Sequence, residues 1–111
     1  MNDRPLWLTV AERVSSVWDV DGNCGLVVGA TYREEMQRIR EIAPHATMLV
    51  PGIGAQGGDV EAAVRAGLDT RGAGMLLSAS RSVLFSEDPG AAARALRDEI
   101  NSAREMVHAA R

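Results

Sequence analysis

A short aliphatic run followed by an amphipathic segment occurs three times in this chain, and this repeat constrains the fold more than any other feature. The runs lie at residues 25–29, 48–50 and 74–78, at a spacing of about 25 residues. Each run is apolar throughout, as strands are when both faces of a parallel sheet are covered. We therefore expect an α/β protein built from parallel βα repeats.

The segments around the first strand carry helical patterns. Before it, apolar residues recur at helical spacing and predict an amphipathic helix over residues 6–18. The apolar positions of that helix are Leu6, Val10, Val14 and Val17. After the strand, Thr31 and Glu34 have the spacing of a capping box, so Thr31 is the expected start of a helix that must stop before Pro44. The expected buried stripe of this second helix is Met36, Ile39 and Ala43.

Two further helices follow the second and third strands. Asp59 is the expected N-cap of a helix that ends at Gly67. A long final helix is predicted from an apolar stripe that runs towards the C-terminus. That stripe consists of Ala93, Leu96, Ile100, Ala103 and Val107.

The length of the chain sets a limit on this architecture. Three parallel strands make a small sheet with two unpaired edges, which proteins normally cover. A closed eight-stranded barrel needs about 250 residues, whereas this chain has 111. No linker or low-complexity segment marks a second domain. We expect residues 1–111 to form a single partial domain, either a piece of a larger fold or a unit completed by oligomerisation.

Composition excludes several classes of function. All 12 basic residues are arginine, so this chain alone cannot perform chemistry that needs a lysine ammonium group. One cysteine, Cys24, excludes an internal disulfide and a multi-cysteine zinc site, and we expect no metal. A net charge of −3 without a basic block argues against nucleic-acid binding. No apolar run is long enough to cross a membrane and no leader opens the chain, so the expected location is the cytoplasm.

The loop after the second strand is the most informative segment for function. Residues 51–58 read Pro-Gly-Ile-Gly-Ala-Gln-Gly-Gly and lead into a helix N-terminus. Glycines let the backbone approach a ligand closely, and the helix N-terminus favours an anion. Gly52, Gly54 and Gly57 also have the spacing of a dinucleotide-binding loop. The acidic residue that such a site needs about 20 residues later is missing, which leaves an NADP-binding half-domain as a weaker alternative.

Arg81 follows the third strand, where the carboxyl end of a parallel strand opens into a ligand crevice. Its planar guanidinium matches a phosphate group. Two consecutive βα loops, one rich in glycine and one with Arg81, fit the phosphate site that barrels form after their last two strands. The alternative is a surface arginine that pairs with Glu87 or Asp88.

Three motifs taken in order resemble the orotidine 5′-phosphate decarboxylase family, and most of all its longer bacterial branch. They are Val-Val-Gly-Ala-Thr at 27–31, Pro-Gly-Ile-Gly-Ala-Gln-Gly-Gly-Asp at 51–59, and Ser80-Arg81. The resemblance covers roughly residues 25–103. It implies the C-terminal part, with strands six to eight, of a TIM (β/α)8 barrel. It also implies a homodimer that converts orotidine 5′-monophosphate to UMP and carbon dioxide in pyrimidine biosynthesis, without metal or organic cofactor.

The resemblance also assigns the site residues. Gln56 matches the glutamine that spans the phosphate and the pyrimidine, and Arg81 matches the phosphate-binding arginine. Ser80 stands where many members have a glycine that donates its N–H to the phosphate. The full set of expected substrate- and phosphate-binding residues is Pro51, Gly52, Gln56, Gly57, Ser80 and Arg81.

The catalytic residues of the family are not in this sequence. They form an Asp-x-Lys-x-x-Asp motif on earlier strands, and this chain has no lysine. We therefore expect no catalytic residue here and no decarboxylase activity from the isolated 111 residues. A non-catalytic phosphate-binding or assembly module is the alternative from a different functional class.

Overall fold

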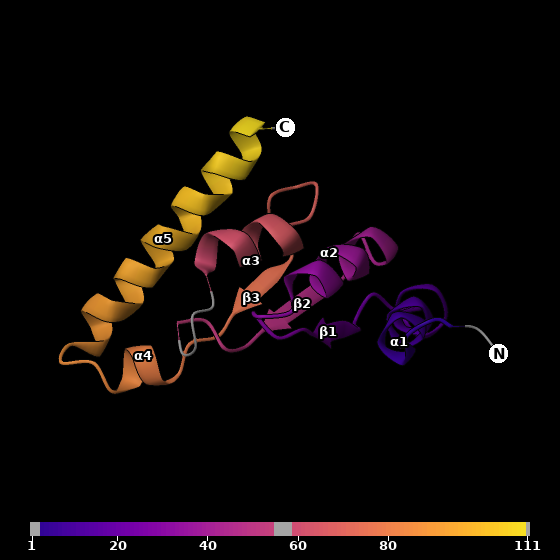
Figure 1. Ribbon diagram of the computed structural model, residues 1–111, viewed down its shortest axis with the longest axis horizontal. Coiled ribbons are helices and arrows are strands. Elements are labelled where there is room, and N and C mark those ends of the chain that lie inside the picture. Colours follow the sequence, from indigo (N-terminus) through magenta and orange to yellow (C-terminus); the bar gives the residue numbers. More distant parts are fainter. Residues whose placement is uncertain (1–2, 55–58, 111) are drawn as a thin grey trace.

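A computed structural model describes residues 3–54 and 59–110, which form a three-stranded sheet with helices (Figure 1). The strands are β1 (Gly25–Val27), β2 (Thr47–Val50) and β3 (Met75–Leu77), in the spatial order β1-β2-β3. Both pairs of neighbouring strands are parallel. The predicted α/β class with three parallel strand-and-helix repeats is therefore confirmed.

Helices fill the connections and the C-terminal part of the chain. They are α1 (Leu6–Arg13), α2 (Arg33–Ile42), α3 (Val60–Gly67), the short α4 (Arg81–Leu84) and α5 (Pro89–Ala110), with a π-helical turn η1 (Val14–Trp18) after α1. Figure 1 shows α5 as a long helix beside α3, and α1 beyond the β1 edge of the sheet. Within residues 3–54 and 59–110, no helix combines the length and the apolar content that a bilayer crossing requires.

One face of the sheet packs against α2, α3 and α5. Met48 and Val50 of β2 are fully buried and share a core with Met36 of α2, Val64 of α3 and Val107 of α5. Alternate residues of a strand point to opposite faces, so β2 supplies these two side chains to the same layer.

The opposite face of the sheet is bare. Val27, Leu49 and Leu76 lie at one register level across the three strands, and their exposed fractions are 70%, 42% and 60%. The expectation that both faces of these strands are buried is therefore wrong for this chain, because α2, α3 and α5 cover one face and no described helix covers the other. A contiguous aliphatic row of this kind is typical of a surface that further protein covers.

The predicted helix over residues 6–18 is present as α1 and η1, but its predicted apolar face is confirmed only at Val14, which is buried. The other three predicted positions are exposed, Leu6 at 78%, Val10 at 41% and Val17 at 49%, whereas Leu8 and Ala11 are buried instead. The reason is the neighbour: α1 packs against α2, and Trp7 lies under the guanidinium of Arg38 at 5.7 Å from the ring centre. This contact turns the Leu6 side of the helix away from the core.

Thr31 is not the N-cap of α2, contrary to the capping-box prediction. The Tyr32 N–H donates to the carbonyl of Gly29 at 3.1 Å, which places Thr31 inside a turn. The helix then begins two residues later, at Arg33, without a side-chain cap. The predicted stripe of Met36, Ile39 and Ala43 is buried, and α2 ends before Pro44 as expected.

The predictions for the later helices are confirmed except at one position. The Asp59 carboxylate accepts hydrogen bonds from the N–H groups of Glu61 and Ala62 and caps α3. In α5, Ala103 and Val107 are buried as predicted, whereas Ala93 is exposed because the first turns of α5 extend past the sheet. Sequence patterns missed α4, which has only four residues.

A buried arginine of α2 fixes the loops at the amino ends of the strands. Arg40 Nε donates to the carbonyl of Gly67 at 2.7 Å, at the end of α3. Its Nη1 donates to the carbonyls of Ala43 and Ala46, and its Nη2 donates to the carbonyl of Gly74 at 2.9 Å. One guanidinium therefore ties the connection before β2 to the connection before β3.

Asp69 stands next to this arginine and organises the loop that leads into β3. Its carboxylate is buried and accepts hydrogen bonds from the N–H groups of Arg71 and Ala73, each at 2.9 Å. Burial by itself would raise the pKa of Asp69, but these hydrogen bonds and the charge of Arg71 outweigh it and lower the pKa. Burial lowers the pKa of Arg40, an effect that the charge of Asp69 opposes.

Gly74 has to be glycine beside these two side chains. Its φ is +87°, and an added Cβ would lie 2.8 Å from Asp69 Oδ2 and 2.9 Å from Arg40 Nη2. The backbone can approach the guanidinium closely only because no side chain stands there.

Replacing Arg40 should destabilise the fold strongly. Arg40→Lys keeps the positive charge but cannot reach the same carbonyls, so we expect the free energy of unfolding to fall by about 2–4 kcal/mol. Urea denaturation of the 111-residue chain, followed by circular dichroism, measures this loss. The control is Arg97→Lys on the exposed side of α5, which should change stability little. Equal midpoints for the two variants would contradict the role of Arg40.

Asp69 should make the stability depend on acid. Its pKa is lower in the folded chain than in the unfolded chain, where it is about 3.9. The stabilisation is therefore complete above that value and is lost as the pH falls through the folded pKa. Asp69→Asn should be less stable at pH 7 and lose less stability between about pH 6 and pH 3. Urea midpoints across this range test it, with the exposed Asp98→Asn as control; an unchanged pH profile in Asp69→Asn would count against it.

Candidate functional site

A hollow of about 460 Å³ lies where the carboxyl ends of the three strands meet. All three loops that follow the strands contribute to its wall. The lining residues include Gly29, Thr31, Pro51, Gly52, Ser80 and Arg81. The hollow has this position because the carboxyl ends of parallel strands lie at one edge of the sheet.

Backbone hydrogen bonds hold the three loops next to one another. The Ala30 N–H donates to the carbonyl of Pro51 at 3.0 Å, which joins the first loop to the second. The Ile53 N–H donates to the carbonyl of Ser78 at 3.4 Å, which joins the second loop to the end of β3. These hydrogen bonds hold the described parts of the three loops together in one wall.

The second loop needs glycine at two described positions. Gly52 has a φ of +89° and Gly54 a φ of +77°, a backbone region that other residues rarely adopt. An added Cβ on Gly54 would lie 3.2 Å from Ser82 Oγ of α4. The glycine-rich loop thus runs directly against the helix that carries Arg81.

The charge of the hollow suits an anion. Arg81 is the first residue of α4, directly after Ser80, and its side chain is exposed. Among the described residues, no carboxylate forms an ion pair with Arg81, so it does not bridge to Glu87 or Asp88. Asp88 instead accepts a hydrogen bond from the N–H of Ala91 in α5. The described lining therefore contains a guanidinium and no carboxylate.

Four of the six predicted site residues are brought together by the fold. Pro51 and Gly52 line the hollow from the loop after β2, and Ser80 and Arg81 line it from the segment after β3. The other two, Gln56 and Gly57, lie outside the described residues. Thr31, predicted to be a helix cap, instead lines the hollow; its place in the loop that follows the first strand was the available signal.

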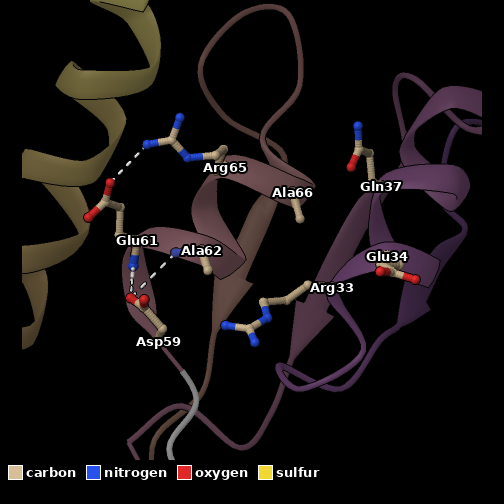
Figure 2. A pocket seen from close by; sticks show the side chains of 8 residues that line it. All are labelled: Arg33, Glu34, Gln37, Asp59, Glu61, Ala62, Arg65 and Ala66. Carbon is tan, nitrogen blue, oxygen red and sulfur yellow. Dashed lines mark hydrogen bonds and ion pairs between the residues drawn. The ribbon is translucent and has the colours of Figure 1, made fainter.

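A second hollow of about 500 Å³ lies between α2 and α3 (Figure 2). Its side chains carry charges of both signs, and several already have partners. Asp59 caps α3, and Glu61 pairs with Arg65 at 2.8 Å. In the part of the chain that the structure describes, no cluster of three His, Cys, Asp or Glu side chains could hold a metal ion. The edge of the sheet is therefore the better candidate site.

Comparison with known proteins agrees with this architecture. A model of the Orotidine 5′-phosphate decarboxylase / HUMPS family matches residues 5–96. Orotidine 5′-phosphate decarboxylase of Ralstonia nicotianae is 46% identical over 110 residues, which cover 93% of this chain and 41% of that protein. The enzyme of Bordetella pertussis is 49% identical over 109 residues, which cover 91% and 40%.

Solved structures give the same result. Leishmania donovani UMP synthase superposes with a TM-score of 0.90 at 50% identity, over 94% of this chain and 23% of that one. Leishmania donovani OMP decarboxylase superposes with a TM-score of 0.86 at 45% identity, over 94% and 40%. These neighbours are TIM barrels, so the three repeats are part of a barrel of that kind.

This chain spans about two-fifths of the length of the curated relatives described above. The family model nevertheless matches most of its residues, from the first helix into α5. The chain therefore belongs to the orotidine 5′-phosphate decarboxylase / HUMPS family.

Proposed function

We propose that this chain supplies the phosphate-binding C-terminal part of an orotidine 5′-phosphate decarboxylase. The enzyme would convert orotidine 5′-monophosphate to UMP and carbon dioxide in pyrimidine biosynthesis, as a cytoplasmic homodimer without a cofactor. The observation that carries the proposal is the hollow at the strand ends, where the Pro51–Gly52 loop and the Ser80–Arg81 loop meet. Among the described lining residues, Arg81 is the one that carries a charge, and its positive charge suits a phosphate.

Each residue of the proposed site has a chemical role. The guanidinium of Arg81 forms charge-assisted hydrogen bonds to the phosphate oxygens. Ser80 donates its backbone N–H to the same group, in place of the glycine that many members of the family have. Pro51 and Gly52 line the pocket. Gln56 and Gly57 complete the proposal on the ground of the family motif, with Gln56 spanning the phosphate and the pyrimidine.

The chemical step requires residues that this chain does not contain. In the family, a lysine protonates the pyrimidine carbon as carbon dioxide leaves, and the sequence here has no lysine. Phosphate contacts far from the reacting carbon can still supply binding energy that lowers the barrier of that step. We propose this division: residues 1–111, as one partial domain, bind the phosphate, and the remaining repeats of the barrel perform the chemistry.

The bare face of the sheet supports this division. Val27, Leu49 and Leu76 form an exposed aliphatic row, and the outer edges of β1 and β3 have no neighbouring strand in the described chain. In a closed barrel, such a row belongs to the packed interior and both edges are paired. The missing repeats would therefore stabilise the phosphate site as well as complete it.

Joining this chain to the missing part tests the proposed function. The segment of the Ralstonia nicotianae enzyme that precedes the matched region is fused to residues 5–111. The fused protein should consume orotidine 5′-monophosphate in an absorbance assay, whereas neither part alone should do so. A non-catalytic module would bind phosphate and self-associate without turnover. A folded but inactive fusion, or turnover by the isolated chain, would overturn the proposal.

Removal of the Arg81 charge should affect only substrates that carry a phosphate. In the fused protein, Arg81→Met should lower kcat/KM for orotidine 5′-monophosphate by about 10- to 100-fold, the cost of losing a charged hydrogen-bond partner. Turnover of orotidine, which has no phosphate, should not change. The exposed Arg97→Met is the matched control. Equal losses on both substrates would show that Arg81 does not act on the phosphate.

A further inference from the structure

We infer that the hydroxyl of Ser78 binds the nucleoside part of the ligand and distinguishes a nucleotide from free phosphate. This inference rests on the proposed function of the hollow. Ser78 is not among the residues that the sequence motifs single out, and it comes directly after the last residue of β3. It lines the same hollow as Pro51 and Arg81.

The alternation of side chains along β3 gives the direction in which Ser78 points. Met75 and Leu77 pack against the helix-covered core, and Leu76 stands exposed on the bare face. Ser78 lies two residues after Leu76, and alternate residues of a strand point to the same face. The Ser78 side chain therefore points to the bare face, at the carboxyl end of the strand. The Ser78 N–H donates to the carbonyl of Val50 at 2.9 Å, which extends the strand pairing through this residue.

The residues level with Ser78 on the neighbouring strands carry no polar side chain. The matching positions on the other strands, two residues beyond Val27 and Leu49, are Gly29 and Pro51. Glycine and proline are small and offer no side-chain hydrogen bond. At this level of the sheet, the Ser78 hydroxyl is therefore the polar side-chain group that faces the hollow.

The distance between Ser78 and the proposed phosphate site matches the shape of a nucleotide. Ser80 comes two residues later, after the end of β3, so the two residues are at most about 6–7 Å apart, the span of two residues of extended chain. A phosphate held by Ser80 and Arg81 therefore places its attached ribose, and not the phosphate itself, at the level of Ser78. A serine hydroxyl both donates and accepts hydrogen bonds, so it can pair with a sugar hydroxyl or with a polar edge of the base.

The hydroxyl is available for this role. The backbone N–H and carbonyl of Ser78 form hydrogen bonds with Val50 and Ile53. Within residues 3–54 and 59–110, no group forms a hydrogen bond with the Ser78 hydroxyl. Ser86, by contrast, uses its hydroxyl to bond the carbonyl of Val83 inside the chain. The Ser86 hydroxyl therefore has a structural role, whereas the Ser78 hydroxyl is left to bind a ligand in the hollow.

Two substitutions of equal shape isolate the hydroxyl. Ser78→Thr keeps it and Ser78→Val replaces it with a methyl group, so any effect of added volume is shared. In the fused protein, binding of UMP and of inorganic phosphate is measured by calorimetry. UMP should bind about three- to tenfold more weakly to Ser78→Val than to Ser78→Thr, the cost of one neutral hydrogen bond. Inorganic phosphate should bind both equally, and Ser102→Ala on the exposed side of α5 should change neither affinity.

The outcomes separate this inference from the proposed function. Equal UMP affinities for the Thr and Val variants overturn the role of Ser78, and so does an equal loss of phosphate binding. A fused protein that binds UMP no better than inorganic phosphate also overturns it, since no nucleoside contact is then made. A fused protein that prefers UMP through Ser78 but shows no turnover supports the contact and overturns only the decarboxylase proposal.

Discussion

The buried guanidinium of Arg40 is the interaction on which the arrangement of the strands depends. It donates to carbonyl groups at the end of α3, before β2 and before β3, with Asp69 and the side-chain-free Gly74 beside it. The carbonyl of Gly74 also accepts a hydrogen bond from the N–H of Met48, so the same carbonyl joins Arg40 to β2 directly. By holding the amino ends of two strands together, Arg40 also determines where their carboxyl ends emerge. Arg40 and the hollow therefore lie at opposite ends of the same sheet, and in TIM barrels the carboxyl end is the one that carries the active site.

Glycine residues and backbone hydrogen bonds determine the shape of the hollow. Gly52 and Gly54 allow a loop that runs against α4, and backbone hydrogen bonds join it to the ends of β1 and β3. Arg81 stands at the rim without a carboxylate partner among the described residues. A site that leaves its cation unpaired loses little stability at the surface, because exposed ion pairs contribute little. The unpaired charge is then available to an anion.

Much of the fold could be predicted because the deciding contacts are local. Aliphatic runs identified the strands, and Asp59 identified the start of α3 through hydrogen bonds to residues two and three positions away. The long-range contacts could not be predicted. Arg40 reads as a surface arginine of an amphipathic helix, yet its partners include carbonyls 27 and 34 residues away. The apolar face of α1 depends on α2, which a periodicity alone does not reveal.

The position of the hollow could be predicted where it follows from topology, and its lining could not be predicted where it depends on the orientation of side chains. Pro51 and Ser80 follow neighbouring parallel strands, so their meeting at one edge could be expected. The capping-box spacing predicted Thr31 as a helix cap. The turn that holds Thr31 instead depends on a hydrogen bond from the Tyr32 N–H to the Gly29 carbonyl, which no sequence pattern reveals. Ser78 lies in an apolar run, and only the exposure of Leu76 shows which face it continues.

A crystal structure of the fused barrel with UMP bound is the most direct test of the central claim that the loops after β2 and β3 close on one phosphate. The account predicts that the phosphate lies in the hollow, within hydrogen-bond distance of the Ser80 N–H and the Arg81 guanidinium. A phosphate held elsewhere, for example between α2 and α3 near Arg33 and Arg65, would contradict it.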